Sequence, residues 1–179
     1  MRAVLVAGMP GAGKGEFVKV AELMGYKVLR MGEVVRGYAR AAGIPEDDAT
    51  IGGFASKERE THGSEIWARR TLTGLEDRMV IEGVRSMAEL RAFREALGRE
   101  IVLVAVVAGL RRRYERLVDR DRADAPEGFN EFLKRDEREL GWGLGGVIAS
   151  ADLYLVNDGG IEVLRADAAR LLKDVFETA

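Results

Sequence analysis

The sequence contains no cysteine, which excludes a disulfide scaffold and a thiolate metal site and suits a reducing compartment. It has a single histidine, His62, and a lone histidine is usually a surface residue, so we expect no catalytic role for it. The longest apolar stretch, residues 101–110, is too short to cross a bilayer. Because Met1-Arg2 runs directly into a strand-like segment, we expect no signal peptide and a cytoplasmic protein with no membrane partner.

Excess charge of one sign is also absent, because the formal net charge is only -2. This gives no reason to expect broad attraction to nucleic acid or anionic membranes, so any positive field has to be local. With 179 residues, 47% of them hydrophobic and 32% charged, the chain has the composition and length of one soluble globular domain with a full core.

Short apolar runs rich in β-branched residues recur along the chain, with helical patterns between them. They are typical of strands covered on both faces, and the alternation predicts a parallel sheet with right-handed crossovers. The five runs are Ala3–Ala7, Lys27–Arg30, Met79–Glu82, Ile101–Val107 and Leu153–Val156. We therefore predict a three-layer α/β fold with a five-stranded parallel sheet, and ligands at the carboxyl ends of its strands.

The segment after the first run fits the phosphate-loop pattern G-x-x-x-x-G-K and lies between a strand and a helix, the context that confirms this motif. Glycines let several backbone N–H groups point inward at phosphate oxygens, the helix N-terminus adds positive partial charge, and the lysine reaches the outer phosphates. We predict that ATP is bound by Gly8, Met9, Pro10, Gly11, Ala12, Gly13, Lys14, Gly15 and Glu16.

One position departs from the common pattern, because Gly15 follows Lys14 where many phosphate loops place a Mg²⁺-binding Ser or Thr. We therefore expect Mg²⁺ to be held mainly by phosphates, waters and a carboxylate from elsewhere. Glu82 is the candidate, because it ends an apolar strand and can hold a Mg²⁺-bound water there. The alternative is a strand-end acid that caps the following helix.

Two further stretches carry candidate acceptor residues at strand ends. Gly32 allows close backbone approach after the second strand, and Arg36 lies one turn into the next helix, where a solvated role is the alternative. Arg85 follows Glu82-Gly83, and Ser86 is placed to cap a helix that starts at Met87. We predict that the acceptor-side helices span about residues 32–75. Within this span, residues 46–53 form a loop, and residues 54–75 form a helical stretch that is interrupted at Gly63. Trp67 is predicted to be a core residue, with stacking on a base as the alternative.

A basic segment follows the fourth strand, and we predict that it forms half of a helical lid over residues 110–140. Arg113, Arg116 and Arg120 fall together on one helical face, and we assign Arg116 and Arg120 to charge stabilisation during catalysis, with Lys14. For most of the other arginines we expect a solvated face with ion pairs to nearby acids, and this is also the alternative for Arg116 and Arg120. The core would comprise residues 1–109 and 141–179 of one domain. We expect the glycines at 141–146 to form the hinge of this lid or an ordinary loop. The chain is predicted to close with a helix over residues 161–179.

Taken together, these residues resemble nucleoside-monophosphate-kinase-type proteins over nearly the full length. Gly8–Gly15 matches the phosphate loop of adenylate-kinase-like enzymes. Residues 32–36 resemble the Gly-Asp-Leu-Leu-Arg segment of those enzymes, and residues 82–85 resemble their Asp-Gly-Phe-Pro-Arg segment. Residues 116–120 resemble the segment that carries their paired lid arginines. Residues 151–159 are similar to the last strand and turn of dephospho-CoA kinases. The chain also looks like an archaeal family of adenylate-kinase-related proteins, whose loop has Glu at the position of Glu16.

The resemblance implies an ATP- and Mg²⁺-dependent kinase whose acceptor is a nucleotide or a similar small phosphorylated molecule. A phosphate acceptor needs no general base, which fits the absence of an obvious one. Two alternatives stay open. One is a partner-regulated ATPase or switch, and the other is a protein that only binds nucleotide. We expect no nucleic-acid partner, and the sequence leaves the acceptor, the donor base and the oligomeric state open.

Overall fold

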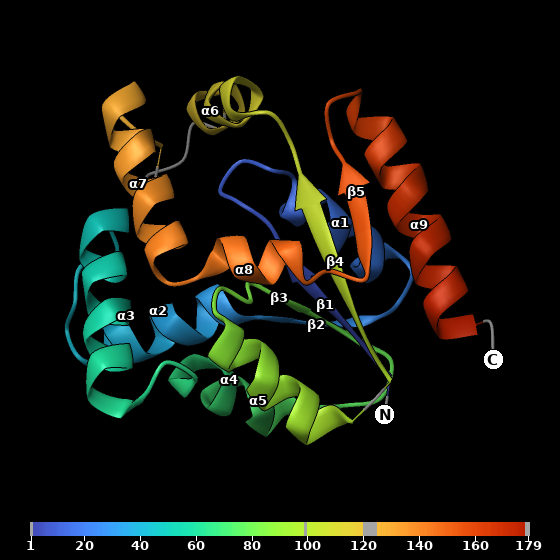
Figure 1. Ribbon diagram of the computed structural model, residues 1–179, viewed down its shortest axis with the longest axis horizontal. Coiled ribbons are helices and arrows are strands. Elements are labelled where there is room, and N and C mark those ends of the chain that lie inside the picture. Colours follow the sequence, from blue (N-terminus) through green and yellow to red (C-terminus); the bar gives the residue numbers. More distant parts are fainter. Residues whose placement is uncertain (1, 99, 120–124, 178–179) are drawn as a thin grey trace.

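The computed structural model describes residues 2–98, 100–119 and 125–177, and its centre is a five-stranded parallel sheet (Figure 1). The strand order is β2-β3-β1-β4-β5. The strands are β1 (Ala3–Ala7), β2 (Lys27–Arg30), β3 (Met79–Glu82), β4 (Ile101–Val107) and β5 (Leu153–Val156), the five segments predicted. The prediction of a three-layer α/β fold with a parallel sheet is confirmed.

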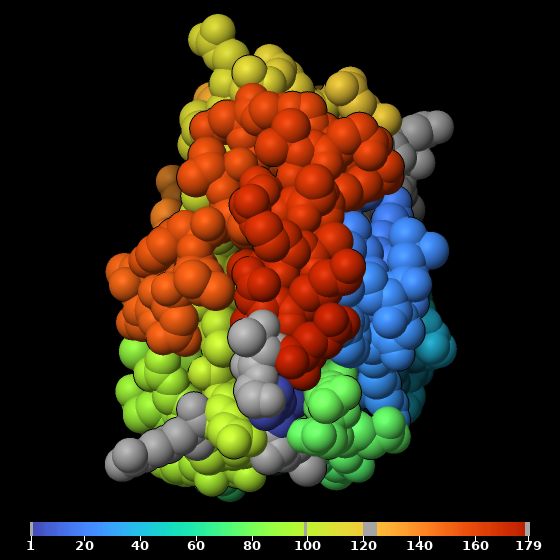
Figure 2. Space-filling model, turned by 90° about the vertical axis from the view of Figure 1, so that its right-hand side faces the viewer, coloured from blue at the N-terminus to red at the C-terminus, as the bar shows by residue number. Residues whose placement is uncertain are grey.

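Alternating residues of the strands feed two hydrophobic cores, one on each face of the sheet. Leu5, Ile81 and Leu103 point to the larger core, which is covered by α2 to α5 and α8. Val6 and Val104 point to the other core, which is covered by α1 and α9. Figure 2 shows α9 along the outside of that second layer, beside the blue surface of the α1–β2 region. Burial on both faces explains why the central strands β1, β3 and β4 are almost uniformly apolar.

The helices connect successive strands in the manner of α/β proteins. Their bounds are α1 (Lys14–Leu23), α2 (Met31–Ala41), α3 (Asp48–His62), α4 (Ile66–Thr71), the 3-10 turn η1 (Leu72–Gly74), α5 (Met87–Leu97), α6 (Leu110–Val118), α7 (Phe129–Gly141), α8 (Leu144–Ala149) and α9 (Ile161–Glu177). Within the described ranges, none of them is long and apolar enough to cross a membrane.

Two helices, α6 and α7, lie beyond the carboxyl ends of the strands, in the segment predicted as a lid (Figure 1). The tip between them was predicted over 121–129. Residues 121–124 of this tip, together with Arg120, lie outside the described residues.

Residues 46–53 were wrongly predicted as a loop, because α3 already starts at Asp48. The cause is a cap: Asp47 Oδ1 accepts a hydrogen bond of 2.9 Å from the backbone N–H of Thr50, which satisfies a donor of the first turn. The predicted break at Gly63 is confirmed, with φ at 98°. The glycine-rich stretch 141–146 is not an extended loop, since α7 runs to Gly141 and α8 begins after Gly143, whose φ is 102°.

Candidate phosphate-binding site

The loop from Gly8 to Lys14 closes tightly between β1 and α1, and none of its three glycines has room for a side chain: a Cβ on Gly8 would lie 2.3 Å from the Val106 carbonyl oxygen. A Cβ on Gly11 would lie 2.4 Å from the carbonyl oxygen of Arg113, and one on Gly13 would lie 2.3 Å from Asn157 Nδ2. Their φ angles of 77° and 113° also belong to the left-handed region that favours glycine. The glycine requirement at these positions is therefore both steric and conformational.

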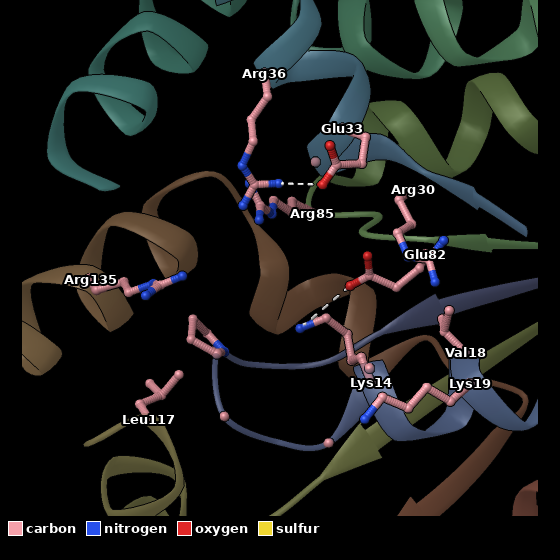
Figure 3. A pocket seen from close by; sticks show the side chains of 15 residues that line it. Lys14, Val18, Lys19, Arg30, Glu33, Arg36, Glu82, Arg85, Leu117 and Arg135 are labelled. Atoms are coloured by element: carbon pink, nitrogen blue, oxygen red, sulfur yellow. Dashed lines mark hydrogen bonds and ion pairs between the residues drawn. The ribbon is translucent and has the colours of Figure 1, made fainter. Parts of the chain in front are cut away.

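Lys14 begins α1 and turns back across the loop (Figure 3). Its ammonium donates to the Gly8 carbonyl at 2.7 Å and lies 3.9 Å from Glu82 Oε1. Burial lowers the pKa of Lys14 below its ordinary value, and the nearby Glu82 carboxylate opposes that shift. The lysine is thus desolvated and next to a single carboxylate, which is an environment that favours binding of an anion.

Glu82 reaches this point because β1, β2 and β3 end in register. It is paired with Val6 on β1 and with Arg30 on β2. The next residue, Gly83, donates its N–H to the Val6 carbonyl at 3.0 Å, which holds the strand end against the phosphate loop. Within the described residues, no group of three or more His, Cys, Asp or Glu gathers that could hold a metal ion. Glu82 is the carboxylate in ion-pair contact with Lys14, and Glu139 acts on the same lysine from further away.

A cavity of about 270 Å³ opens over the loop and brings most of the predicted phosphate and acceptor residues together (Figure 3). Its basic side chains outnumber its acidic ones, which are Glu33 and Glu82. The basic residues that line it are Lys14, Lys19, Arg30, Arg36, Arg85 and Arg135. Gly32 lines the same cavity. The surplus of positive charge is local, in a chain whose net charge is slightly negative.

Arg36 and Arg85 enter the cavity from different elements. Arg36 rises from α2 and forms a hydrogen bond of 3.0 Å with Glu33 Oε1. Arg85 precedes α5, and its Nε lies 3.0 Å from Glu139 Oε2 on α7. Burial acts to lower the pKa of Arg85, but Glu139, Glu82 and further carboxylates raise it above its ordinary value. Arg85 is therefore a permanent cation within the described site.

Ser86 has the capping role that was predicted as one option. Its hydroxyl accepts from the N–H of Glu89 at 3.1 Å, and the Glu89 carboxylate accepts from the N–H of Ser86 at 3.2 Å. This reciprocal capping box starts α5 at Met87. Glu89 also accepts a hydrogen bond of 2.7 Å from the N–H of Arg85, so the cap fixes the backbone at the entrance of the site.

Arg116 lies outside this cavity. One of its terminal nitrogens donates to the Asn157 carbonyl at 2.8 Å, and Asn157 in turn donates its side-chain N–H to the Ala12 carbonyl at 2.8 Å. Arg116 lines a second cavity of about 370 Å³, together with Gly13, Glu16, Asp119, Asn157, Gly159 and Ile161. The structure therefore separates Arg116 from Arg36 and Arg85.

Glu16 is engaged in ion pairs with Lys19 and Arg165, at 2.7 and 2.8 Å. Burial acts to raise the pKa of its carboxyl, but the hydrogen bonds from Lys19 and Arg165 hold it below its ordinary value. The pair with Arg165 links the start of α1 to α9. His62 is half exposed, with Nε2 3.8 Å from Glu58 Oε2, and Trp67 is fully buried in the core, as predicted for both.

The pair formed by Arg113 and Asp136 was not predicted from the sequence. Both side chains are buried, and the two are joined by hydrogen bonds of 2.8 and 2.5 Å. Arg113 also donates to the Pro10 carbonyl at 3.1 Å, which ties α6 and α7 to the phosphate loop. A signal was present in the sequence, because Arg113 lies four residues before the buried Leu117 and so shares its helical face.

Comparison with known proteins agrees with this architecture. A family model described as an AAA domain matches residues 7–130. A UPF0200 protein of Thermoplasma volcanium is 46% identical over 175 residues, covering 97% of each chain. A UPF0200 protein of Hyperthermus butylicus is 43% identical over 173 residues, covering 94% of this chain and 92% of that protein.

Two solved structures of kinases are similar in fold. Shikimate kinase from Acinetobacter baumannii in complex with shikimate has a TM-score of 0.63 and 20% identity, covering 99% of this chain and 94% of that one. A gluconokinase from Sinorhizobium meliloti 1021 has a TM-score of 0.60 and 14% identity, and the match covers 98% of this chain and 94% of that one. At these identities the likeness shows the fold alone, the α/β fold of P-loop kinases.

Proposed function

The chain belongs to the UPF0200 family and contains an AAA-type P-loop domain, and from this premise we propose that it is an ATP-dependent phosphotransferase. It would move the γ-phosphoryl group of ATP to a nucleotide or a similar small phosphorylated acceptor. The observation that carries this proposal is one continuous cavity, in which the phosphate-loop lysine Lys14 and the arginines Arg36 and Arg85 line the same space.

The donor side follows from the loop. Its backbone N–H groups and Lys14 would hold the β- and γ-phosphates, and the second cavity, lined by Arg116 and Asn157, would take the nucleoside end of ATP. Glu82 would position Mg²⁺ through a water molecule, since it lies next to Lys14 and is only partly buried. The metal would add Lewis-acid stabilisation of the phosphate charge.

On the acceptor side, Gly32, Arg36 and Arg85 would hold the anionic group that attacks. An acceptor oxygen forms a bond to the γ-phosphorus while the bond from that phosphorus to the β–γ bridging oxygen breaks, and ADP leaves with the electron pair. A phosphate oxygen that is already ionised needs no general base. Catalysis then consists of positioning and charge neutralisation, which is the contribution that the surrounding guanidinium groups can make. We keep the sequence-based assignment of Arg120 to this task as part of the proposal.

The test is ADP release from ATP and Mg²⁺, measured with and without AMP, CMP, UMP, GMP, dUMP, dephospho-CoA and the compact phosphorylated carboxylate 3-phosphoglycerate. The proposal expects a large rise with at least one phosphorylated acceptor. Flat rates across the panel, with hydrolysis stimulated by a protein or RNA, would instead support the partner-regulated ATPase.

A matched pair of variants on α2 tests the acceptor assignment. Arg36→Gln removes a guanidinium from the cavity, whereas Arg40→Gln removes one that lies outside it and pairs with Glu46 at 2.7 Å. We expect Arg36→Gln to raise the KM of the acceptor about tenfold or more, because a charge-assisted hydrogen bond is lost. Arg40→Gln should leave the KM unchanged, and equal effects of the two variants would contradict the assignment.

A further inference from the structure

Beyond Arg36 and Arg85, the acceptor side continues as a small extension of about 50 Å³ between α2, α3 and α7. Four residues line both spaces, namely Gly32, Arg36, Arg85 and Arg135, so the extension lies directly beside the main cavity. Two further charged groups from α7, Arg138 and Glu139, border it together with Asp48 of α3. An acceptor whose attacking phosphate lies on Arg36 and Arg85 would have this space beside it.

The extension holds internal carboxylates against its arginines. Asp48 Oδ1 lies 3.2 Å from an Arg135 nitrogen, and Asp48 Oδ2 forms a close ion pair with Arg138. Glu139 likewise forms an ion pair with Arg85. Each of these contacts joins α7 to an element of the acceptor side, so the protein's own carboxylates occupy the positions that a ligand anion would take.

The walls leave no surface suited to a nucleobase. Trp142 is the aromatic residue that borders the extension, and the guanidinium carbons of Arg59, Arg85 and Arg138 lie 4.4, 5.4 and 5.8 Å from its ring centre. The indole is therefore already engaged in cation–π contacts. Trp67, the other tryptophan, is fully buried. A volume of about 50 Å³ is also far below that of ordinary small-molecule pockets, which are roughly 300 Å³ or larger.

We propose that the acceptor is a compact molecule with two anionic groups, not a nucleoside monophosphate. This inference rests on the proposed function and narrows its acceptor class. The attacking phosphate lies on Arg36 and Arg85, next to the phosphate loop. The second anion, a carboxylate or another phosphate, displaces Asp48 and binds Arg135 and Arg138. Bidentate contacts with guanidinium groups suit either anion.

The experiment compares two probes that differ in one group. 3-Phosphoglycerate carries a phosphate and a carboxylate, whereas glycerol 3-phosphate has a neutral hydroxymethyl group in place of the carboxylate. Binding is measured by calorimetry with the phosphate loop saturated by a nonhydrolysable ATP analogue, so that neither probe competes for that loop. AMP is the third ligand. We expect 3-phosphoglycerate to bind about tenfold or more tightly than glycerol 3-phosphate, and more tightly than AMP.

Two variants act in opposite directions. Arg138→Gln should abolish the preference for 3-phosphoglycerate while leaving glycerol 3-phosphate binding unchanged. Asp48→Asn should strengthen 3-phosphoglycerate binding, because the internal competitor loses its charge while its shape is kept. If Asp48 has only a structural role, Asp48→Asn would weaken binding of all three ligands.

Equal affinity for the two glycerol compounds, or tighter binding of AMP that Arg138→Gln does not alter, would overturn the inference. Failure of the proposed function looks different. In that case the ATP analogue does not bind, or no acceptor raises ADP release, whatever the order of the equilibrium affinities.

Discussion

The buried pair of Arg113 and Asp136 offers the sharpest test of how this site is held together. The two side chains join α6 to α7 through two charge-assisted hydrogen bonds, and Arg113 also donates to the Pro10 carbonyl of the phosphate loop. Arg113 and Asp136 are each only 5% exposed. Replacing Arg113 by Met keeps much of the side-chain volume but leaves the Asp136 carboxylate buried without its partner.

Loss of one member of a buried ion pair costs about 3–5 kcal/mol, because the remaining charge stays desolvated. We therefore expect Arg113→Met to lower the free energy of unfolding by that amount. The double variant Arg113→Met with Asp136→Leu removes both charges and should recover most of the loss, since an apolar pair of similar volume has no desolvation penalty. Arg112→Met on the exposed face of α6 is the matched control and should change stability by no more than about 0.5 kcal/mol.

The measurement is urea unfolding of the wild type and the three variants, followed by circular dichroism and analysed by linear extrapolation. The reasoning about a buried charge is refuted if Arg113→Met costs less than about 1 kcal/mol, or if the double variant is no more stable than the single one. In addition, Arg113→Met should weaken binding of the ATP analogue, because the Pro10 carbonyl loses its donor and the loop its support.

Two further predictions concern the phosphate loop. Gly13→Ala should abolish ATP binding, because its Cβ would lie 2.3 Å from Asn157 Nδ2 and the backbone there is left-handed. Gly15 has open space around it, so Gly15→Ala should bind ATP as the wild type does. Calorimetric titration distinguishes the two variants, and equal affinities for ATP would argue against a steric requirement. Lys14→Met should be more stable than the wild type at pH 7. Burial places the folded-state pKa of Lys14 below its ordinary value of 10.5, so charging it opposes folding, and the stability of the wild type relative to the variant should rise as pH increases through the folded-state pKa toward 10.5. Melting temperatures of both proteins across this range give the test, and a difference that does not change with pH would show that Lys14 titrates normally.

The sheet and the helix starts differ in how well local sequence patterns predict them. Buried strands lie in a nonpolar environment on both faces, so uniform apolar runs identify them without knowledge of their neighbours. The phosphate loop is equally local, since its glycines and lysine act within a few residues. By contrast, the start of α3 was missed because Asp47 works as a cap only when the backbone after it turns helical, which the apolar periodicity of that stretch does not reveal.

The charged residues of α7 mark the limit of sequence-based prediction. Read along the chain, Arg135, Asp136, Arg138 and Glu139 look like a solvated helical face. In the fold they divide among three different partners, Asp48, Arg113 and Arg85. Asp48 and Arg138 are 90 residues apart, so nothing in their local sequence links them.

The sequence by itself determined the sheet, the phosphate loop and the presence of Glu82 and Arg85 at a strand end, because each depends on residues close together along the chain. Only the tertiary structure decided that Arg116 faces Asn157 and not the acceptor cavity, and that α7 places carboxylates on the acceptor-side arginines. The physical reason is that an ion pair between helices depends on how the helices pack, and packing is set by the two cores beneath them.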